Sequence, residues 1–185
     1  MHPGMKLPRR LRWTIILLAL AVIAWWGWDY WRERRFDSLI VAAANRYQID
    51  PALVKAVVWR ESRFNPGARG RAGELGLMQI RLPAAAQWAS AEHISSFEHR
   101  ACLDPATNIL AGAWYLKHLL LRYQDTDNPA AYALADYNAG RSNVLKWLNG
   151  QAATRSGVFI AQIGFPGTRD YVRTILRKAE RYRPM

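Results

Sequence analysis

Residues 50–66 read DPALVKAVVWRESRFNP, and this stretch contains signals for both ends of a helix. Asp50 can accept hydrogen bonds from the first free amide groups, and Pro51 suits the first helical position. The Asn-Pro-Gly sequence at residues 65–67 cannot continue a helix. The sequence therefore predicts a helix of about three turns between these signals.

One acidic residue falls on the apolar face of this helix. Val54, Val57 and Val58 recur at spacings of three and four. The same spacing leads to Glu61. Because burial disfavours a charged carboxylate, we expect Glu61 to keep its proton to a higher pH than a surface glutamate and to serve as a general acid. The alternative is that Glu61 turns to solvent at the helix end and pairs with a neighbouring arginine.

A glycine-rich loop follows the helix. Glycine stands at every third position from residue 67 to residue 76, and the loop leads into Leu-Met-Gln-Ile at residues 77–80. The backbone of such a loop can come close to a bulky ligand. Stability alone does not explain four glycines in one loop.

Five sequence blocks occur in order between about Leu39 and Tyr182. They are Glu-Ser-x-Phe-Asn-Pro at 61–66, Gly-Leu-Met-Gln-Ile at 76–80, Asn108-Ile109 with Tyr115-Leu116, Tyr-Asn-Ala-Gly at 137–140, and Thr-Arg-Asp-Tyr-Val at 168–172. In this order they resemble the soluble lytic transglycosylases of bacterial cell walls, which have a lysozyme-like fold. The chain departs from that family where it has Gly70 instead of serine, Glu74 and Asp136 instead of alanine, and Gly167 instead of glutamate.

The resemblance implies an enzyme with one catalytic carboxylate. In this family a glutamate protonates the oxygen that links N-acetylmuramic acid to N-acetylglucosamine, and the substrate's acetamido group stabilises the cationic centre. The same glutamate then takes the proton of the C6 hydroxyl, which closes a 1,6-anhydro ring. The resemblance assigns this role to Glu61 and implies that the substrate-binding residues are Ser62, Met78, Gln79, Tyr137 and Asn138. For each of these five, the alternative is a role in packing or in helix capping.

Two other classes of function remain open. A muramidase-type hydrolase of the goose-lysozyme kind would use water, and a second carboxylate such as Asp136 near that water would favour it. A non-catalytic wall-binding protein would not need Glu61. Two other acids are not expected to serve as the second carboxylate, because Asp104 reads as a helix cap and Glu74 lies in the glycine loop.

The net charge of +12 predicts attraction to anionic surfaces. Residues 1–35 contain seven basic and two acidic side chains, so the remainder carries about +7. The partner expected from the resemblance is the peptidoglycan glycan strand. The basic residues are not interleaved with aromatic residues as in a nucleic-acid platform, so no nucleic-acid partner is expected.

No metal or other cofactor is expected from the sequence. Cys102 is the only cysteine, so no internal disulfide can form. His93, His99 and Cys102 have irregular spacing and lack a fourth ligand, which argues against a zinc site.

An uncharged run at residues 13–28 follows a basic N-terminus, and tryptophans crowd its far end. The pattern predicts a single transmembrane anchor at residues 13–31 with an aromatic belt. Residues 1–12 are then a cytoplasmic basic tail, and residues 37–185 are the catalytic domain, outside the inner membrane on the periplasmic side.

A cleaved signal peptide is the alternative for this segment, with Val22 and Ala24 as the small residues before the cut. We favour the uncleaved anchor, because cleavage there would leave a run of exposed tryptophans at the new N-terminus.

The rest of the chain has helical periodicity, with no strand signal of useful length. Helices are predicted at residues 37–48, 83–88, 105–122, 129–139 and 142–150, and a last one begins with Thr168 as its cap. Residues 89–103 and 151–167 are predicted to be loops. The expected fold class is all-α, a lysozyme-like lytic transglycosylase domain preceded by one transmembrane helix.

Overall fold

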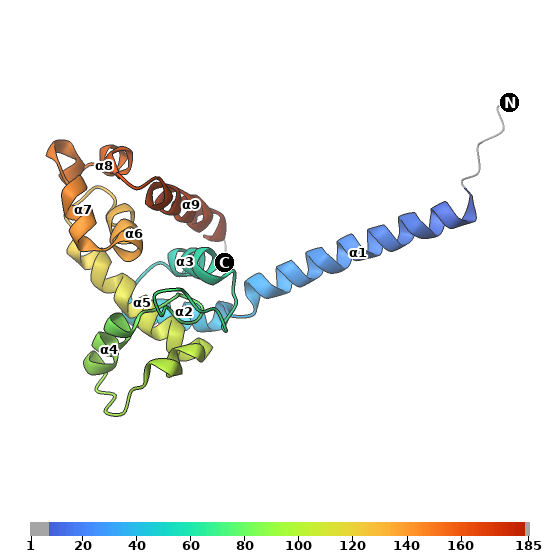
Figure 1. Cartoon of the computed structure of the whole chain (residues 1–185), viewed down its shortest axis with the longest axis horizontal. Coiled ribbons are helices and arrows are strands. Elements are labelled where there is room, and N and C mark those ends of the chain that lie inside the picture. The colour runs from blue at the N-terminus through green and yellow to red at the C-terminus, as the bar shows by residue number, and fades with distance from the viewer. Residues whose placement is uncertain (1–7, 184–185) are drawn as a thin grey trace. The chain divides into compact units, whose positions relative to one another are not determined.

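The computed structural model describes residues 8–183, which form helices joined by loops and short turns (Figure 1). The chain divides into two compact units between Arg35 and Phe36. Residues 1–7 of the expected basic tail and the last two residues of the expected catalytic domain lie outside this description.

The first unit contains one long helix, α1 (Arg9–Arg34), and none of its residues is buried. The helical segment that it begins has an apolar window with a mean hydropathy of 1.6, which is long and apolar enough to cross a membrane. A signal sequence would have the same length and composition, so α1 fits both interpretations of the N-terminus.

The second unit is all-α. Its helices are α2 (Asp37–Tyr47), α3 (Pro51–Ser62), α4 (Leu82–Ala91), α5 (Pro105–Arg122), α6 (Pro129–Ala139), α7 (Arg141–Trp147), α8 (Ser156–Gln162) and α9 (Pro166–Tyr182), with 3-10 turns η1 (His99–Leu103) and η2 (Gly150–Ala153). Extended pairing in residues 8–183 is limited to two isolated bridges. The all-α prediction is therefore confirmed.

Helix α3 forms as the sequence predicts. Asp50 accepts a hydrogen bond from the amide of Ala52 at 2.8 Å, and Arg63 ends the helix in the left-handed conformation. The helix packs against α2 and α9, and its valine stripe is fully buried. Its last turn reaches the surface and exposes part of Glu61.

Helix α5 packs against four other elements, namely α2, α4, α6 and η1. Asp104 caps it by accepting a hydrogen bond from the amide of Thr107 at 2.9 Å, as predicted. The stripe formed by Ile109, Ala113 and Leu116 is fully buried. This helix is the support on which the glycine loop and α6 are held.

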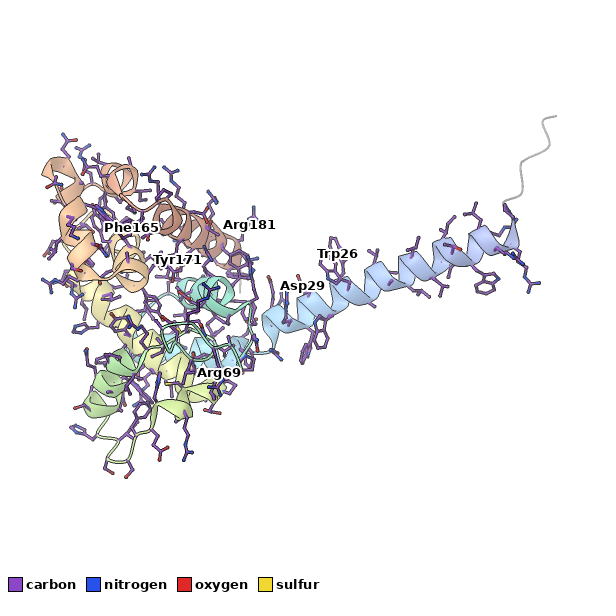
Figure 2. All side chains as sticks on the ribbon, viewed as in Figure 1. Trp26, Asp29, Arg69, Phe165, Tyr171 and Arg181 are labelled. Atoms are coloured by element: carbon purple, nitrogen blue, oxygen red, sulfur yellow. The ribbon has the colours of Figure 1, made fainter. Side chains whose placement is uncertain are left out.

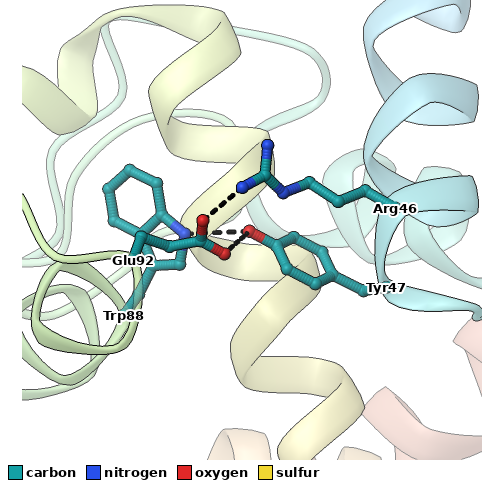
Figure 3. Close-up of polar contacts among 4 residues, drawn as sticks. All are labelled: Arg46, Tyr47, Trp88 and Glu92. Atoms are coloured by element: carbon teal, nitrogen blue, oxygen red, sulfur yellow. Dashed lines mark hydrogen bonds and ion pairs between the residues drawn. The ribbon is translucent and has the colours of Figure 1, made fainter.

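A polar cluster ties α4 to α2 (Figure 3). Glu92 accepts hydrogen bonds from Arg46 and, at 2.8 Å, from the hydroxyl of Tyr47. The same hydroxyl accepts a bond from the indole nitrogen of Trp88 at 3.0 Å. Because Trp88 is only 4% exposed, this cluster fixes the C-terminal half of α4 and so determines where its first turn lies.

Several predicted boundaries were wrong. Helix α4 extends to Ala91, and the 3-10 turn η1 occupies part of the expected loop at 89–103. The expected loop at 151–167 contains helix α8, whose Phe159 is fully buried. Helix α7 ends at Trp147 rather than at residue 150.

The start of the last helix was also wrong. Helix α9 begins at Pro166, which has the backbone angle that a first turn needs and no amide to leave unpaired. Thr168 is therefore inside the helix and is not its cap. Its hydroxyl instead donates a hydrogen bond to Asn138 at 2.7 Å.

Candidate active site

A pocket of about 450 Å³ opens where the end of α3, the glycine loop, the start of α4, the middle of α5 and the end of α6 meet. Its lining includes three of the predicted site residues besides Glu61, namely Gln79, Tyr137 and Asn138. Ser62 and Met78 are not part of the lining.

Glu61 lies in the last turn of α3 and faces the pocket. The hydroxyl of Tyr171 on α9, labelled in Figure 2, donates a hydrogen bond to its Oε1 at 2.5 Å. Burial raises the pKa of Glu61, and the bond from Tyr171 and the charge of Arg60 oppose this increase only in part. The carboxyl group therefore holds its proton more tightly than a surface glutamate, as the valine stripe predicts.

The alternative in which Glu61 pairs with a neighbouring arginine does not describe this structure. Arg60 forms an ion pair with Asp170 at 3.7 Å. The guanidinium of Arg63 lies 3.6 Å from the centre of the Trp59 ring.

One hydrogen bond joins Tyr137, which lines the pocket, to Met78, which does not. The hydroxyl of Tyr137 donates to the backbone oxygen of Met78 at 2.7 Å. Burial, and then the charge of Glu61, raises the pKa of Tyr137 well above its usual value. Met78 is fully buried, and its sulfur would lie 2.3 Å from a Cβ added at Gly112. Met78 thus packs into the core and orients Tyr137 through its carbonyl group.

Gln79 and Asn138 present opposite hydrogen-bonding groups to the pocket. The side-chain nitrogen of Gln79 donates to the backbone oxygens of Ala68 at 3.1 Å and Gly76 at 2.9 Å, which leaves its oxygen as the group available to a ligand. The side-chain oxygen of Asn138 accepts the bond from Thr168, which leaves its amide hydrogens as the donors available to a ligand. The pocket therefore has an acceptor at residue 79 and a donor at residue 138.

Ser62 makes the hydrogen bond within its own helix that a role in packing or helix capping predicts. Its hydroxyl donates to the backbone oxygen of Val58 one turn earlier, at 3.1 Å. This bond lies within α3 and helps to end the helix beside Glu61.

Asp136 lines the pocket but belongs to an ion pair. It is 3% exposed, and its Oδ2 accepts hydrogen bonds from Arg122 at 2.7 Å and from the hydroxyl of Tyr123 at 2.8 Å. Removing either donor would leave a buried charge poorly compensated. This arrangement ties α6 to α5 and does not resemble the free carboxylate that activates a water molecule.

The glycine loop is held in place by Asn108 of α5. Its side chain is fully buried, donates to the backbone oxygens of Leu75 and Cys102 at 2.8 and 2.6 Å, and accepts from the amide of Met78 at 2.7 Å. Gly76 has a φ of +73°, and a Cβ there would lie 2.3 Å from the Asn108 nitrogen. The loop can approach α5 this closely only with glycine at residue 76.

Sequence reasoning missed two residues at this site. Tyr171 occurs on the predicted apolar stripe of the last helix, and nothing in that spacing indicates that its hydroxyl reaches Glu61. The sequence places Glu74 in the glycine loop and does not predict it as a site residue, yet it lines the pocket. Its position as a departure from the family pattern was the signal that could have identified it.

No metal site is evident in the part of the chain that the structure describes, since no three His, Cys, Asp or Glu side chains there are grouped suitably. One ring nitrogen of His99 lies 2.9 Å from the backbone oxygen of Ile80. Cys102 is buried, and burial raises its pKa to about 11, so it is an unreactive thiol at neutral pH.

A helical domain with one protonatable glutamate at the end of a buried helix, facing a cleft, is a lysozyme-like domain. The chain belongs to the Transglycosylase SLT domain family, whose model matches residues 38–159.

Curated relatives carry related names. The chain is 32% identical to the soluble lytic murein transglycosylase of Escherichia coli over 168 residues, which is 88% of this chain and 26% of that protein. It is 36% identical to the membrane-bound lytic murein transglycosylase F of Desulfosudis oleivorans over 118 residues, which is 62% of this chain and 24% of that protein. The chain thus spans about a quarter of the length of these relatives.

Solved structures agree with this membership. The 70 kDa soluble lytic transglycosylase of Escherichia coli superposes with a TM-score of 0.73 at 30% identity, over 89% of this chain and 27% of that one. A structure of the 70 kDa soluble lytic transglycosylase in complex with bulgecin A has a TM-score of 0.73 at 28% identity, over 82% of this chain and 24% of that one. The lysozyme-like fold is therefore confirmed.

Proposed function

We propose that this chain is a peptidoglycan lytic transglycosylase, which cleaves the β-1,4 bond between N-acetylmuramic acid and N-acetylglucosamine and leaves 1,6-anhydro-N-acetylmuramic acid ends. The observation that carries the proposal is the buried, protonatable Glu61 facing the pocket. Family membership and the names of the relatives support it.

Glu61 acts first as the acid and then as the base. Because Tyr171 donates to Oε1, the proton resides on Oε2 and passes from there to the oxygen of the glycosidic bond. As that bond breaks, the substrate's acetamido oxygen stabilises the positive charge at C1. The C6 hydroxyl then attacks C1 and gives its proton back to Glu61, so no water molecule is consumed.

Gln79 and Asn138 are suited to bind acetamido groups. An acetamido group has one N–H donor and one carbonyl acceptor, and these match the acceptor of Gln79 and the donor of Asn138. Tyr137 forms the wall of the pocket next to Glu61. Ser62 and Met78 act indirectly, through the end of α3 and through the orientation of Tyr137.

The membrane is the second partner in this proposal. Helix α1 anchors the chain in the inner membrane, and residues 37–185 act on glycan strands on the periplasmic side. The apolar composition of α1, the basic residues before it and the membrane-bound relatives support this location.

Analysis of the products tests the proposal. Purified sacculi are digested with the full chain in detergent, and the muropeptides are measured by mass spectrometry with and without borohydride reduction. We expect products lighter by one water than those of a muramidase, which resist reduction, and no products from Glu61→Gln. Reducible ends as the main product would establish a muramidase-type hydrolase, and intact sacculi would favour a wall-binding protein.

A further inference from the structure

Two of the chain's departures from the family pattern lie in contact with each other. A Cβ added at Gly70 would be 2.1 Å from Oε2 of Glu74 and 2.8 Å from its Cβ. Gly70 does not have a positive φ, so its backbone does not require glycine. The glycine is needed for space, because any larger residue at position 70 would displace the side chain of Glu74.

The side chain of Glu74 is held in this space. Its Oε2 accepts a hydrogen bond from the amide of Ala72 at 2.9 Å, and its Oε1 lies 4.0 Å from Nε of Arg81. The backbone is fixed as well, since the amide of Gly70 donates to the backbone oxygen of Glu74 at 2.8 Å. The side chain is 25% exposed, and it lines the same pocket as Glu61.

We propose that Glu74 is a second acidic residue of the active site, which the glycine at position 70 admits, and that its carboxylate stabilises the positive charge that develops on the sugar as the glycosidic bond breaks. This inference rests on the proposed function. It concerns the electrostatics of the pocket and leaves Glu61 as the group that transfers the proton.

A fixed negative charge in a partly buried pocket acts on both partners of the proton transfer. The transition state of glycosidic cleavage resembles an oxocarbenium ion, which an anion nearby stabilises. The same charge favours the protonated, neutral form of Glu61 over its anion. Glu74 raises the pKa of Glu61 in this way, although burial contributes more.

Other charged or titratable groups near Glu61 come from every element around the pocket. They are Arg60 on α3, Tyr115 and Arg122 on α5, Asp136 and Tyr137 on α6, Asp170 and Tyr171 on α9, and Arg81 after the glycine loop. Arg60 lies 3.7 Å from Asp170, Arg122 lies 2.7 Å from Asp136, and Arg81 lies 4.0 Å from Glu74, so each of these three acids has a cation beside it. Among these groups Arg60 and Tyr171 lower the pKa of Glu61, whereas Glu74 raises it.

The central variant is Glu74→Gln in the full chain, because it keeps the shape and the bond from Ala72 but removes the charge. We expect kcat on soluble, uncrosslinked glycan strands to fall about tenfold while KM changes less than about twofold, since the charge acts on the transition state. The high-pH limb of kcat/KM, which reports the ionisation of Glu61 in the free enzyme, should move to lower pH.

Two variants serve as references. Glu98→Gln removes the same charge at an exposed residue whose partner is Arg100, and we expect its kinetics to match those of the unchanged chain. Tyr171→Phe removes a hydrogen bond that favours the ionised form of Glu61, so its high-pH limb should move in the opposite direction to that of Glu74→Gln.

The contact between residues 70 and 74 supplies a double-mutant cycle. Gly70→Ser alone should lower the Tm, because the new Cβ displaces Glu74. Adding Glu74→Ala, which restores the family's pair of residues, should recover part of the Tm, because it removes the contacts with the carboxyl group but keeps the Cβ at 2.8 Å. It should not restore kcat or the pH limb. If the Tm losses of the two single variants simply add, the contact does not explain Gly70.

A carbon-13 titration of the Glu61 carboxyl group by NMR, in the full chain and in Glu74→Gln, gives a readout that does not depend on cleavage. A lower Glu61 pKa in the variant, together with the fall in kcat, supports the inference. Equal titration curves would overturn it, as would a Tm change with unaltered kinetics. If the unchanged chain makes reducible ends and Glu74→Gln makes none, the inference is also overturned, because Glu74 would then be a base that activates water. If the unchanged chain cleaves nothing while Glu74 still shifts the titration, the proposed function fails and the electrostatic coupling stands.

Discussion

Glu61 loses much of its hydration in the last turn of α3, and this burial is the largest of the effects that raise its pKa. The hydroxyl of Tyr171 compensates for only part of the loss. The protonated form is what an acid catalyst needs at neutral pH, whereas the ionised form is a burden on the folded state. Burial of this one side chain therefore links activity to stability.

We predict that Glu61→Gln raises the Tm at pH 7 while it abolishes cleavage. A carboxyl group whose pKa is higher in the folded chain contributes stability that is fully present below its unfolded pKa and is lost as the pH rises through the folded pKa. The amide keeps an oxygen for Tyr171 but carries no charge. Each unit of pKa difference corresponds to about 1.4 kcal/mol, which for a domain of this size is a few degrees in Tm.

Thermal unfolding at pH 4 and pH 7 checks this prediction, with Glu98→Gln as the control for a charge that is already exposed. Near pH 4 the variant and the unchanged chain should melt together, because the glutamate is then largely protonated. A Glu61→Gln chain that melts earlier at pH 7 would mean that burial does not govern this carboxyl group.

The position of Glu61 on the apolar face of α3 could be predicted from the sequence, because apolar residues recur along a helix with a fixed period. Gln79, Tyr137 and Asn138 line the pocket, and the substrate-binding role that the family resemblance implies for them stays a prediction. Tyr171 was not found, since its contact joins residues that are 110 positions apart and no local pattern encodes such a distance. The directions of the Gln79 and Asn138 amides likewise depend on partners that only the fold brings together.

At the scale of elements, the glycine loop keeps its shape because Asn108 of α5 forms hydrogen bonds with backbone groups of the loop. Asn108 donates to the backbone oxygens of Leu75 and Cys102 and accepts from the amide of Met78. The oxygen of Leu75 also accepts a bond from the amide of Ile80 at 3.0 Å. The loop contains Gln79 and the backbone oxygen of Met78 that orients Tyr137. One buried amide therefore supports one side of the pocket.

We predict that Asn108→Ala lowers the free energy of unfolding by about 2 kcal/mol or more, because the buried oxygen of Cys102 and the amide of Met78 lose their side-chain partner at about 1–3 kcal/mol each. Chemical denaturation followed by circular dichroism measures this change. Asn143→Ala is the matched control, since that partly buried side chain donates to only one backbone group, the oxygen of Ala139, and its other bond is from the exposed Lys146. Similar losses for the two variants would show that Asn108 is not the main support of the loop.

Helices with a capping residue and a following proline were predicted well, as with Asp50-Pro51 and Asp104-Pro105. Helix α8 was missed because seven residues are too few to establish a period. What holds α8 is tertiary contact, since Phe159 stacks on Tyr132 with ring centres 4.2 Å apart. At the last helix two start signals competed, and the proline at residue 166 determined the first turn.

At the scale of the whole molecule, the two units differ in how they bury apolar surface. Most of the buried residues from Phe36 to Tyr182 belong to one hydrophobic core, and a smaller cluster surrounds Trp88. Helix α1 has no buried residue, and some of its large apolar side chains, Leu17, Ile23 and Trp26 among them, are more than 60% exposed. Exposed apolar surface costs about 25 cal/mol per Å² in water, so a nonpolar medium would stabilise this helix.

We predict that the chain remains in the membrane through α1 and that the domain after it folds without the helix. The full chain should stay with membranes through high-salt and alkaline washes, because an apolar helix in the hydrocarbon core is not held by charge. A chain that begins at Arg35 should be soluble and retain cleavage of sacculi, since the core and the pocket lie entirely in the second unit. Replacing Ala21 and Val22 with Arg is the matched test of the anchor, because two charges at the middle of the helix oppose insertion without altering the second unit. If the mature protein begins near Trp25, the segment is a cleaved signal peptide. If salt alone releases the full chain, its basic charge, and not α1, holds it at the membrane.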